Sequence, residues 1–387
     1  MSRALSDDQQ AIRDGVAELC RQFPGEYWRE LDREQAYPEA FVAALTEGGW
    51  LAALIPEQYG GMGLGLSEAA LILEEINHQG CNSGACHAQM YIMGTILRHG
   101  SEQQKSLYLP KIAAGELRLQ AFGVTEPDAG SNTLALRTRA ERQDDGGWLV
   151  NGQKIWTSRF AHSDLMLLLA RTSTPGEGQS RTFGLSTFLV DLRESGSSIE
   201  ARPIRTLMNH ATVELFINDL ALPADALVGE QGKGFSYILD GMNAERILIA
   251  AECIGDGHWF IEKASAYASE RVVFDRPIGQ NQGVQFPLAR AHAAVEAADL
   301  MRWHAAELFE AGRPCGPEAN MAKLLASEAS WDAANACLNT HGGFGFAEEY
   351  DIERKFRENR LYITAPINNN LILAYLGQHV LGMPKSY

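Results

Sequence analysis

The sequence predicts an α+β protein with an N-terminal helical domain, a middle β-barrel or β-sandwich domain and a C-terminal four-helix bundle. Three observations lead to this prediction. The 387 residues are more than one typical hydrophobic core holds. Apolar residues recur with helical period at both ends of the chain, and between these ends the chain breaks into short strand-like runs. We therefore expect three domains, at residues 1–119, 120–228 and 229–387.

The first domain shows helix signals from Leu5 onward. Ser6 followed by Asp7 and Asp8 is a typical N-cap with acidic residues in the first turn. A second helix is predicted by its apolar residues, which are Ala69, Leu71, Ile72, Leu73 and Ile76. Between the two lies PEQYGGMGLG, residues 56–65, which its glycines mark as a loop.

The middle domain is predicted to be a small β-barrel or β-sandwich. Its apolar runs are short and are separated by Gly, Asp, Asn and Ser clusters, as in GWLVNGQKIWT, DLMLLLART, TFGLSTFLVDL and TVELFINDLAL. The segment SGSSIEARP, residues 195–203, is expected to be a surface turn.

The last domain is predicted to be helical throughout. A long helical pattern follows Gly229, and further helices are expected at residues 288–311, 317–340 and 369–381. Long antiparallel helices with short links are typical of a helix bundle.

The composition excludes several classes of function. The chain has 33 Lys and Arg against 49 Asp and Glu, a net charge of -16, so it lacks the basic surface that nucleic acid needs. No segment is long and apolar enough to span a bilayer, and the polar N-terminus resembles no signal or transit peptide. The six cysteines are scattered without a CxxC pair. We expect a cytoplasmic protein that is large enough to be an enzyme.

Several common motifs are absent from the sequence. It contains neither the glycine pattern of a Rossmann dinucleotide site nor a P-loop, and no zincin or nucleophile-elbow motif. Cys81, Cys86 and His87 lie close together, but their spacing fits no zinc pattern, so we expect them to pack between helices and expect no metal site.

One predicted helix carries charges inside its apolar stripe, which consists of Phe235, Ile238, Leu239, Met242, Ile249 and Cys253. Continuing this stripe from Met242 reaches Glu245 and Arg246. The other faces are apolar too, so the helix should be buried, where a carboxylate is costly unless it is paired or neutralised. Glu245 is therefore either half of a structural Glu–Arg pair or a general base whose pKa burial raises toward the working pH.

Six motifs together resemble the acyl-CoA dehydrogenase family in their order and spacing, over nearly the whole chain. They are PEQYGGMGLG, FGVTEPDAGSN, GQKIWTS, GMNAER, ERVVFDRPIGQNQ and HGGFGFAEEYDIERKFRE. The resemblance implies the acyl-CoA dehydrogenase fold, with the same order of helical, β and four-helix-bundle domains, and assembly as a homotetramer or homodimer.

The resemblance also implies an activity. Family members use FAD to convert an acyl-CoA thioester to the 2-enoyl-CoA. A base removes the α-proton while a hydride leaves the β-carbon for flavin N5. We accordingly expect FAD as the cofactor, an acyl-CoA as the substrate, and electron-transfer flavoprotein as the electron acceptor, in the catabolism of fatty or branched acyl groups.

The resemblance assigns the middle-domain contacts of the flavin to Phe122, Val124, Thr125, Trp156 and Ser158. Trp156 would pack against the isoalloxazine ring, and Ser158 replaces the usual Thr while keeping a hydroxyl donor. From the residues alone, Thr125 also fits an ordinary turn role in TEPDAGSN.

A second group would hold the FAD of a neighbouring subunit. Its members are Arg271, Phe274, Gln282, Asn339, Gly342 and Gly343. An Arg suits a pyrophosphate by its charge and forked donors, although Arg271 alone would fit a solvated surface position. Asp275 replaces the usual Gly after Phe274. Asn368 would bind the FAD ribose or phosphates.

The remaining assignments concern the substrate. Ser131 matches the residue that contacts the CoA arm, although a helix-cap role also fits it. Most family members carry the base near the C-terminus, where this chain has Pro366 in LYITAPINNN. A minority, including isovaleryl-CoA dehydrogenase, carries it on the helix, and GMNAER matches that arrangement. The resemblance thus assigns the base to Glu245, and Arg246 to the substrate site with a nearby carboxylate as its partner.

Proline at position 366 also removes a backbone donor. In the family, the N–H at this position polarises the thioester carbonyl, and proline has none. Either the N–H of Ala365 or Ile367 takes its place, or one donor is missing.

Two other functions fit the same fold. One is a flavin-dependent monooxygenase or oxidase, against which an acid at position 245 argues. The other is a non-catalytic relative that binds FAD or acyl-CoA, which the altered YITAPINNN segment suggests.

Overall fold

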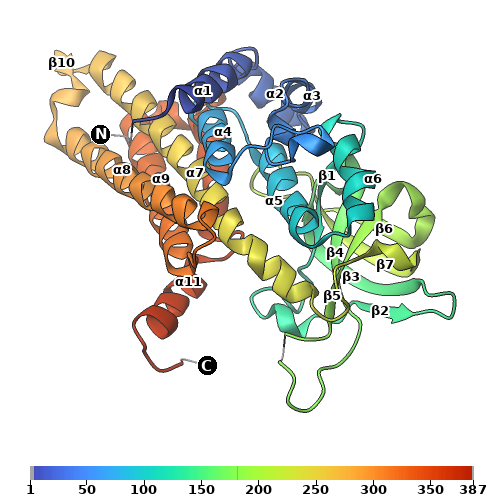
Figure 1. The fold of residues 1–387 in the computed structure, drawn as a ribbon. Helices are drawn as coiled ribbons and strands as arrows, with labels where there is room; N and C mark the ends of the chain where they lie inside the picture. The colour runs from blue at the N-terminus through green and yellow to red at the C-terminus, as the bar shows by residue number, and fades with distance from the viewer. Residues whose placement is uncertain (1–3, 181, 386–387) are drawn as a thin grey trace.

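The computed structural model describes residues 4–180 and 182–385 (Figure 1). The sheet lies to the right in Figure 1, the long C-terminal helices to the left, and the N-terminal helices across the top between them. This order of helical, sheet and helical parts confirms the predicted fold class. Residues 1–3 and 386–387 of the outer predicted domains, and residue 181 of the middle one, lie outside the described residues.

The N-terminal part is built from six helices: α1 (Asp7–Cys20), α2 (Gly25–Glu34), α3 (Glu39–Glu47), α4 (Leu66–His78), α5 (Gly84–His99) and α6 (Glu102–Ala113). Ser6 begins α1 as predicted, because its side chain accepts a hydrogen bond from the Gln9 amide at 3.2 Å and its own amide donates to Gln9 Oε1. The predicted loop before α4 is confirmed and contains one short turn at Glu57–Tyr59.

The middle part is one eight-stranded sheet with the order β6-β7-β3-β2-β4-β5-β8, and β1 pairs in parallel with β4. Its strands are β1 (Leu119–Gly123), β2 (Arg139–Arg142), β3 (Trp148–Ser158), β4 (Leu165–Arg171), β5 (Leu185–Asp191), β6 (Ile199–Pro203), β7 (Thr212–Leu222) and β8 (Leu227–Val228). The turn expected at residues 195–203 is wrong for its second half, which forms the edge strand β6. Because β6 is largely exposed, it lacks the apolar alternation that marks a strand in a sequence.

The C-terminal part contains three long helices and two short ones. They are α7 (Gly234–Glu270), α8 (Gln282–Glu310), α9 (Gly316–His341), α10 (Ile352–Asn359) and α11 (Asn369–Tyr375), with the hairpin β9 (Val272–Val273) and β10 (Arg276–Pro277) between α7 and α8. Helix α4 of the N-terminal part packs along α7 and α8. Among residues 4–180 and 182–385, no helix has the length and apolar character needed to cross a bilayer.

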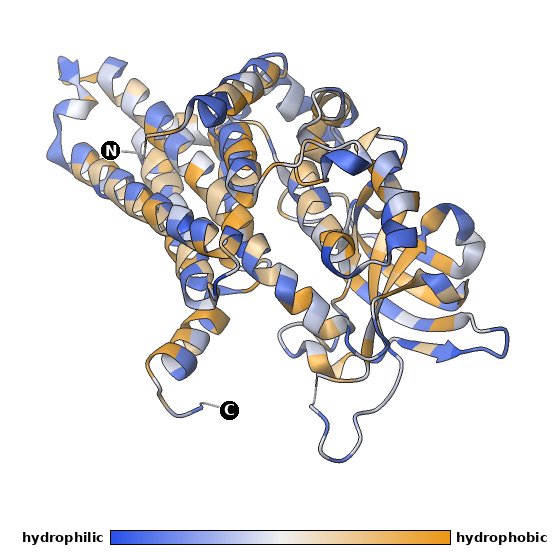
Figure 2. Ribbon diagram, in the orientation of Figure 1, coloured by the Kyte–Doolittle hydropathy of each residue, from blue (hydrophilic) through white to orange (hydrophobic). Residues whose placement is uncertain are grey.

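Helix α5 lies at the junction of the two cores. Its residues Cys86 and Met90 belong to a core shared with α7, α8 and α9. Residues Ile92 and Ile96 belong to a second core with strands β4 and β5. In Figure 2 the central strands are mostly orange, whereas β2 is mostly blue. The apolar interior thus continues through α5 from the sheet to the long helices, and this junction contains the candidate site.

Candidate functional site

Glu245 lies on α7 where the helix passes into the core. Residues 234–243 of α7 are mostly half-exposed or exposed, and from Ala244 onward the helix is buried for several turns. Glu245 is only 5% exposed, and its Oε2 has no hydrogen-bond partner among the described residues. The predicted apolar stripe is wrong for Leu239, which is 45% exposed because it lies in the first, uncovered turns.

The electrostatic surroundings of Glu245 favour its neutral form. Burial raises the pKa of Glu245 to about 7, while His87 and Arg246 act to lower it and Glu252 to raise it. Glu252 lies two turns further along α7, and its Oε1 is 2.6 Å from His87 Nδ1 without the alignment of a hydrogen bond. Burial, assisted by the charge of Glu245, raises the pKa of Tyr91 well above its ordinary value. These groups form a polar strip between α5 and α7.

Arg246 does not have the carboxylate partner that we predicted. Its Nη1 donates to Asn243 Oδ1 at 2.9 Å, its Nε has no partner, and no carboxylate within the described residues forms an ion pair with it. Burial lowers the pKa of Arg246, with Glu245 opposing this shift. The predicted carboxylate partner of Arg246 is therefore wrong, because the side chain that meets the guanidinium is the amide of Asn243, one turn earlier on α7.

The FGVTEP segment is fixed to β3 by a buried ion pair. Lys154 Nζ donates to the carbonyl of Val124 at 3.0 Å and to Glu126 Oε1 at 2.9 Å, and both charged side chains are buried. The carbonyl of Thr125 accepts from the Ile155 amide at 2.9 Å. Phe122, on β1, packs edge-on against Tyr91 of α5. The structure thus brings Phe122, Val124 and Thr125 to the end of β3 that adjoins α5.

Trp156 projects from an irregularity near the end of β3. The pairing register of β3 with β7 shifts between Lys154 and Thr157, and Trp156 has a positive φ of 62°. Such a bulge re-aims a side chain, and the indole of Trp156 is 56% exposed. Ser158 is the last residue of β3, opposite Thr212 of β7. Both predicted flavin contacts therefore lie on one short segment.

Ser131 and Asn368 come together although 237 positions separate them, because Asn368 Nδ2 donates to Ser131 Oγ at 3.4 Å. Asn368 is also the N-cap of α11 and accepts from the Leu371 amide at 3.0 Å. Buried Lys323 holds the same segment by donating to the Ile367 carbonyl at 2.9 Å and to Asn369 Oδ1 at 2.8 Å. The amide of Ala365 donates to the Leu361 carbonyl. Ala365 is therefore not free to polarise a substrate carbonyl.

The second predicted group lies at the other end of α7. Arg271, Gly342, Gly343 and Phe344 line an open cavity of about 480 Å³. The guanidinium of Arg271 lies 5.6 Å from the centre of the Phe344 ring. A Cβ built on either glycine would meet no protein atom within 4 Å, so both backbones face open space. At 1.5 Å per residue, the 26 residues from Glu245 place Arg271 about 39 Å further along the helix axis.

The other members of this group are exposed around the same end of the helices. Phe274 is 93% exposed at the tip of the β9–β10 hairpin, where Phe274 and Asp275 have positive φ values of 53° and 62°. The position of Asp275 thus requires the left-handed conformation that glycine adopts most easily, and Asp tolerates it. Gln282 begins α8, and Asn339 lies in the last turn of α9. The structure therefore separates these residues from Glu245 within one chain.

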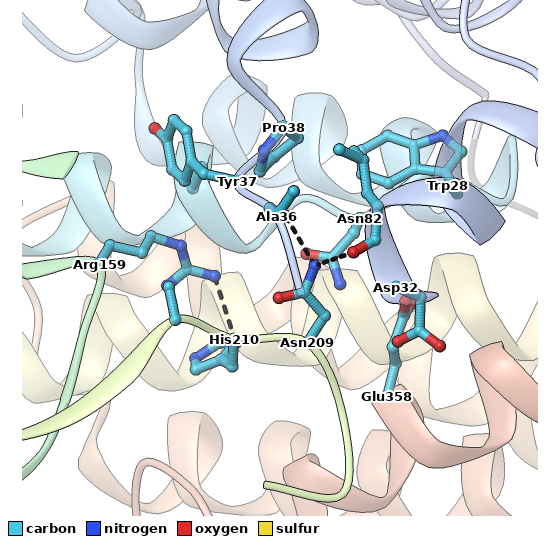
Figure 3. Close-up of a pocket in the computed structure, with 13 residues that line it drawn as sticks. Trp28, Asp32, Ala36, Tyr37, Pro38, Asn82, Arg159, Asn209, His210 and Glu358 are labelled. Atoms are coloured by element: carbon cyan, nitrogen blue, oxygen red, sulfur yellow. Dashed lines mark hydrogen bonds between the residues drawn. The ribbon is translucent and has the colours of Figure 1, made fainter. Parts of the chain in front are cut away.

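Arg159 lies in the site although no sequence motif singles it out. It follows Ser158 directly, is only 7% exposed, and its Nη2 is 3.3 Å from His210 Nδ1 (Figure 3). Burial lowers the pKa of Arg159. His87 and Tyr91 were also missed as site residues, although their spacing of four residues on a predicted helix places both on one face. Within the described parts of the chain, no cluster of His, Cys, Asp or Glu could hold a metal ion.

Comparisons with known proteins agree with this architecture. Models of the acyl-CoA dehydrogenase N-terminal, middle and C-terminal domains match residues 6–116, 121–220 and 232–365. Acyl-CoA dehydrogenase FadE12 of Mycobacterium tuberculosis (strain ATCC 25618 / H37Rv) is 34% identical over 99% of this chain and 98% of that protein. An acyl-CoA dehydrogenase of Bacillus subtilis (strain 168) is 32% identical over 98% of this chain and 99% of that protein.

A solved structure shares the whole fold. The complex of glutaryl-CoA dehydrogenase with glutaryl-CoA superposes with a TM-score of 0.91 at 30% identity, over 100% of this chain and 98% of that chain. Domain order, fold and sequence similarity thus agree along nearly the entire length. The chain belongs to the acyl-CoA dehydrogenase family of oxidoreductases, whose members are typically FAD-dependent.

Proposed function

We propose that the protein converts an acyl-CoA thioester to the 2-enoyl-CoA with FAD, and that Glu245 is the base that removes the α-proton. The observation that carries this proposal is a buried carboxylate with an unpartnered Oε2 and a pKa that burial raises to about 7. A structural ion pair would lower the pKa of Glu245, because a nearby cation favours the charged form. A general base works best when its pKa lies near the working pH.

The residues of the middle domain fit one face of FAD. Trp156 offers an exposed indole ring next to the hydroxyl of Ser158, and Phe122, Val124 and Thr125 lie on the segment fixed to the same strand. An aromatic face and a hydroxyl donor suit an isoalloxazine ring, which has a flat apolar surface and polar edges. When bound, the flavin supplies the acceptor for the hydride that leaves the β-carbon.

The residues at the far end of α7 fit the phosphates of FAD. Arg271 offers a forked cation beside an open cavity, and Gly342 and Gly343 leave room for close approach to the backbone. Gln282, Asn339 and Phe274 lie exposed around this cavity, so the set would serve the FAD of a neighbouring copy. We therefore propose a homodimer or homotetramer, with Asn368 as a further FAD contact and electron-transfer flavoprotein as the acceptor.

The thioester carbonyl needs a hydrogen-bond donor as the α-proton leaves, because negative charge develops on its oxygen. Pro366 has no N–H, and the Ala365 amide is already bonded to Leu361. The amide of Ile367 is the remaining one of the two candidates, and Lys323 holds the same residue by donating to the Ile367 carbonyl, on the following peptide unit. We assign the carbonyl contact to Ile367 and the CoA arm to Ser131 and Arg246. Arg246 forms no ion pair with a carboxylate of residues 4–180 and 182–385.

Anaerobic bleaching of the flavin by a series of straight, branched and dicarboxylic acyl-CoAs tests the proposal. Wild-type protein should bleach with at least one of them, at a rate that rises with pH to a plateau with its midpoint near 7, because Glu245 must be ionised to accept a proton. Glu245→Gln should keep its FAD and bleach about 100- to 10,000-fold more slowly.

The control is Glu30→Gln, which changes an exposed carboxylate on α2 and should bleach at the wild-type rate. Wild-type bleaching rates in Glu245→Gln would contradict the assignment of the base. Rapid oxygen consumption by the reduced protein would instead favour an oxidase or monooxygenase, and FAD binding without reduction by any acyl-CoA would favour a non-catalytic relative.

A further inference from the structure

Arg159 is a buried cation without a carboxylate partner. Its guanidinium contacts His210 Nδ1, and none of the described carboxylates lies within ion-pair distance of it. Two other buried cations have carboxylate partners, since Lys154 pairs with Glu126 at 2.9 Å and Arg302 with Glu74 at 2.7 Å. Buried Lys323 instead donates to two neutral oxygens, whereas the one contact of Arg159 is the ring nitrogen of His210. Because burying an unpaired charge is costly, Arg159 indicates that an anion from outside the chain completes the site.

The surroundings of Arg159 add positive potential. A Cβ built on Gly84 would collide with Arg159 Nη2, so the guanidinium lies against the first residue of α5. The N-terminus of a helix carries free N–H groups and a partial positive charge. Ser83, the N-cap of α5, makes no capping bond, and its buried Oγ has no partner in the described structure. The Gly84 amide is already bonded to Asn82 Oδ1 at 2.9 Å, so the donors left for a ligand at the start of α5 are the Arg159 guanidinium and the Ser83 hydroxyl.

The two carboxylates of the adjoining cavity are already paired. Arg159 lines a cavity of about 30 Å³, enough for about one water molecule. Asp32 and Glu358 lie on its opposite side in Figure 3. Asp32 is bound by Arg357 at 2.7 Å and Glu358 by Arg354 at 2.9 Å. Neither can neutralise Arg159 without breaking its own ion pair.

A continuous strip joins Arg159 to Glu245. Ser83, His87 and Tyr91 repeat every four residues on α5 and so share one face. The face spans about 12 Å from Ser83 to Tyr91, at 1.5 Å per residue. Both Glu245 and Arg159 influence the pKa of Tyr91, which burial raises, so Tyr91 lies near both charges. An acyl chain with its α-carbon at Glu245 would have to follow this face to reach the start of α5.

We propose that Arg159, with Ser83 and the N-terminus of α5, binds a carboxylate at the distal end of the acyl group, so that the substrates are dicarboxylic acyl-CoA thioesters. This specificity rests on the proposed dehydrogenation at Glu245. The distal carboxylate keeps its charge and its bonds, because only the α-proton and the β-hydride leave the acyl chain. A plain alkyl chain would leave the buried guanidinium without a counter-charge.

Adipyl-CoA and hexanoyl-CoA form a matched pair of probes, because they differ only in the distal carboxylate. For flavin bleaching by wild-type protein, kcat/KM with adipyl-CoA should be at least about tenfold above that with hexanoyl-CoA. Glutaryl-CoA and valeryl-CoA form a second matched pair with a shorter chain and should show the same preference. Arg159→Gln should lose about 10- to 100-fold in kcat/KM with the dicarboxylic probe, mainly through KM, and the loss with hexanoyl-CoA should be several-fold smaller. Arg159→Lys should recover part of the loss.

Arg139→Gln, on the exposed side of β2, is the control and should keep the preference for adipyl-CoA. A wild-type preference for hexanoyl-CoA, or an equal loss with both probes in Arg159→Gln, would overturn the carboxylate site. An equal loss together with a lower FAD content would assign Arg159 to the cofactor or the fold instead. These outcomes differ from a failure of the proposed function, in which no acyl-CoA bleaches the flavin.

Discussion

Buried charges have different surroundings in two neighbouring regions of the helical core. Around α10, buried Lys355 lies 2.6 Å from Asp256 and donates to the Cys81 carbonyl, and buried Arg354 donates to Glu358. At the junction of α5, α7 and β3, no described residue bonds to Glu245 Oε2, and no described carboxylate forms an ion pair with Arg159. Both regions belong to the same interior, so burial alone does not distinguish them. What distinguishes the candidate site is therefore that Glu245 and Arg159 lack ion-pair partners among the described residues, and not that they are buried.

The largest expected effect is a loss of stability when the ion pair between Lys355 and Asp256 is broken. Lys355→Met leaves Asp256 buried without its cation and should lower the free energy of unfolding by about 3–5 kcal/mol. Replacing both partners, in Lys355→Met with Asp256→Leu, should recover most of the loss, because no uncompensated charge remains. Urea denaturation of both variants checks this. A single variant as stable as wild type would show that the pair around α10 is not structural.

The next effect concerns Glu245 in the unpaired region, where a substitution should raise the free energy of unfolding instead of lowering it. The pKa of Glu245 rises from an ordinary value of 4.5 to about 7 on folding, which corresponds to a penalty of about 3 kcal/mol for the ionised form. Because the pKa of Glu245 is higher in the folded state than in the unfolded state, the contribution of Glu245 to the free energy of unfolding falls as pH rises from about 4.5 to about 7. Glu245→Gln avoids this penalty, so its stability advantage should be absent near pH 4.5 and reach up to about 3 kcal/mol above pH 7.

Unfolding midpoints of Glu245→Gln and wild type, compared at pH 5 and pH 8 with equal FAD content, measure this difference. Glu30→Gln is again the control, since its exposed carboxylate should give the same difference from wild type at both pH values. A Glu245→Gln protein that is less stable than wild type at pH 8 would indicate that Glu245 is a structural partner after all.

The sequence predicts the order of the domains and the position of Glu245 for clear physical reasons. Helical and strand periodicity reflect local burial, and a charge inside an apolar stripe is visible before any tertiary contact is known. The edge strand β6 was missed because an exposed strand has no apolar alternation. Leu239 was expected to be buried because periodicity gives the face of a helix but not where along its length the covering elements end.

The partners within the site could not be predicted in the same way. Arg159 meets the start of α5 only because β3 ends beside it, and His87 meets Glu252 only through the packing of α5 on α7. That Arg246 donates to Asn243 and forms no ion pair with a described carboxylate likewise depends on what the neighbouring residues bring to it in the folded chain. These contacts depend on tertiary packing, so they cannot be predicted from the spacing of residues along the chain.

Proton exchange at the substrate α-carbon is the most direct test of the role of Glu245. FAD-loaded protein is incubated anaerobically with adipyl-CoA in deuterated buffer at pH 8, and deuterium at the α-carbon of the recovered thioester is measured by mass spectrometry. Wild type should incorporate deuterium, and Glu245→Gln should do so about 100- to 10,000-fold more slowly while still binding the thioester. Exchange at the wild-type rate in Glu245→Gln would contradict the account, because another group would then remove the proton.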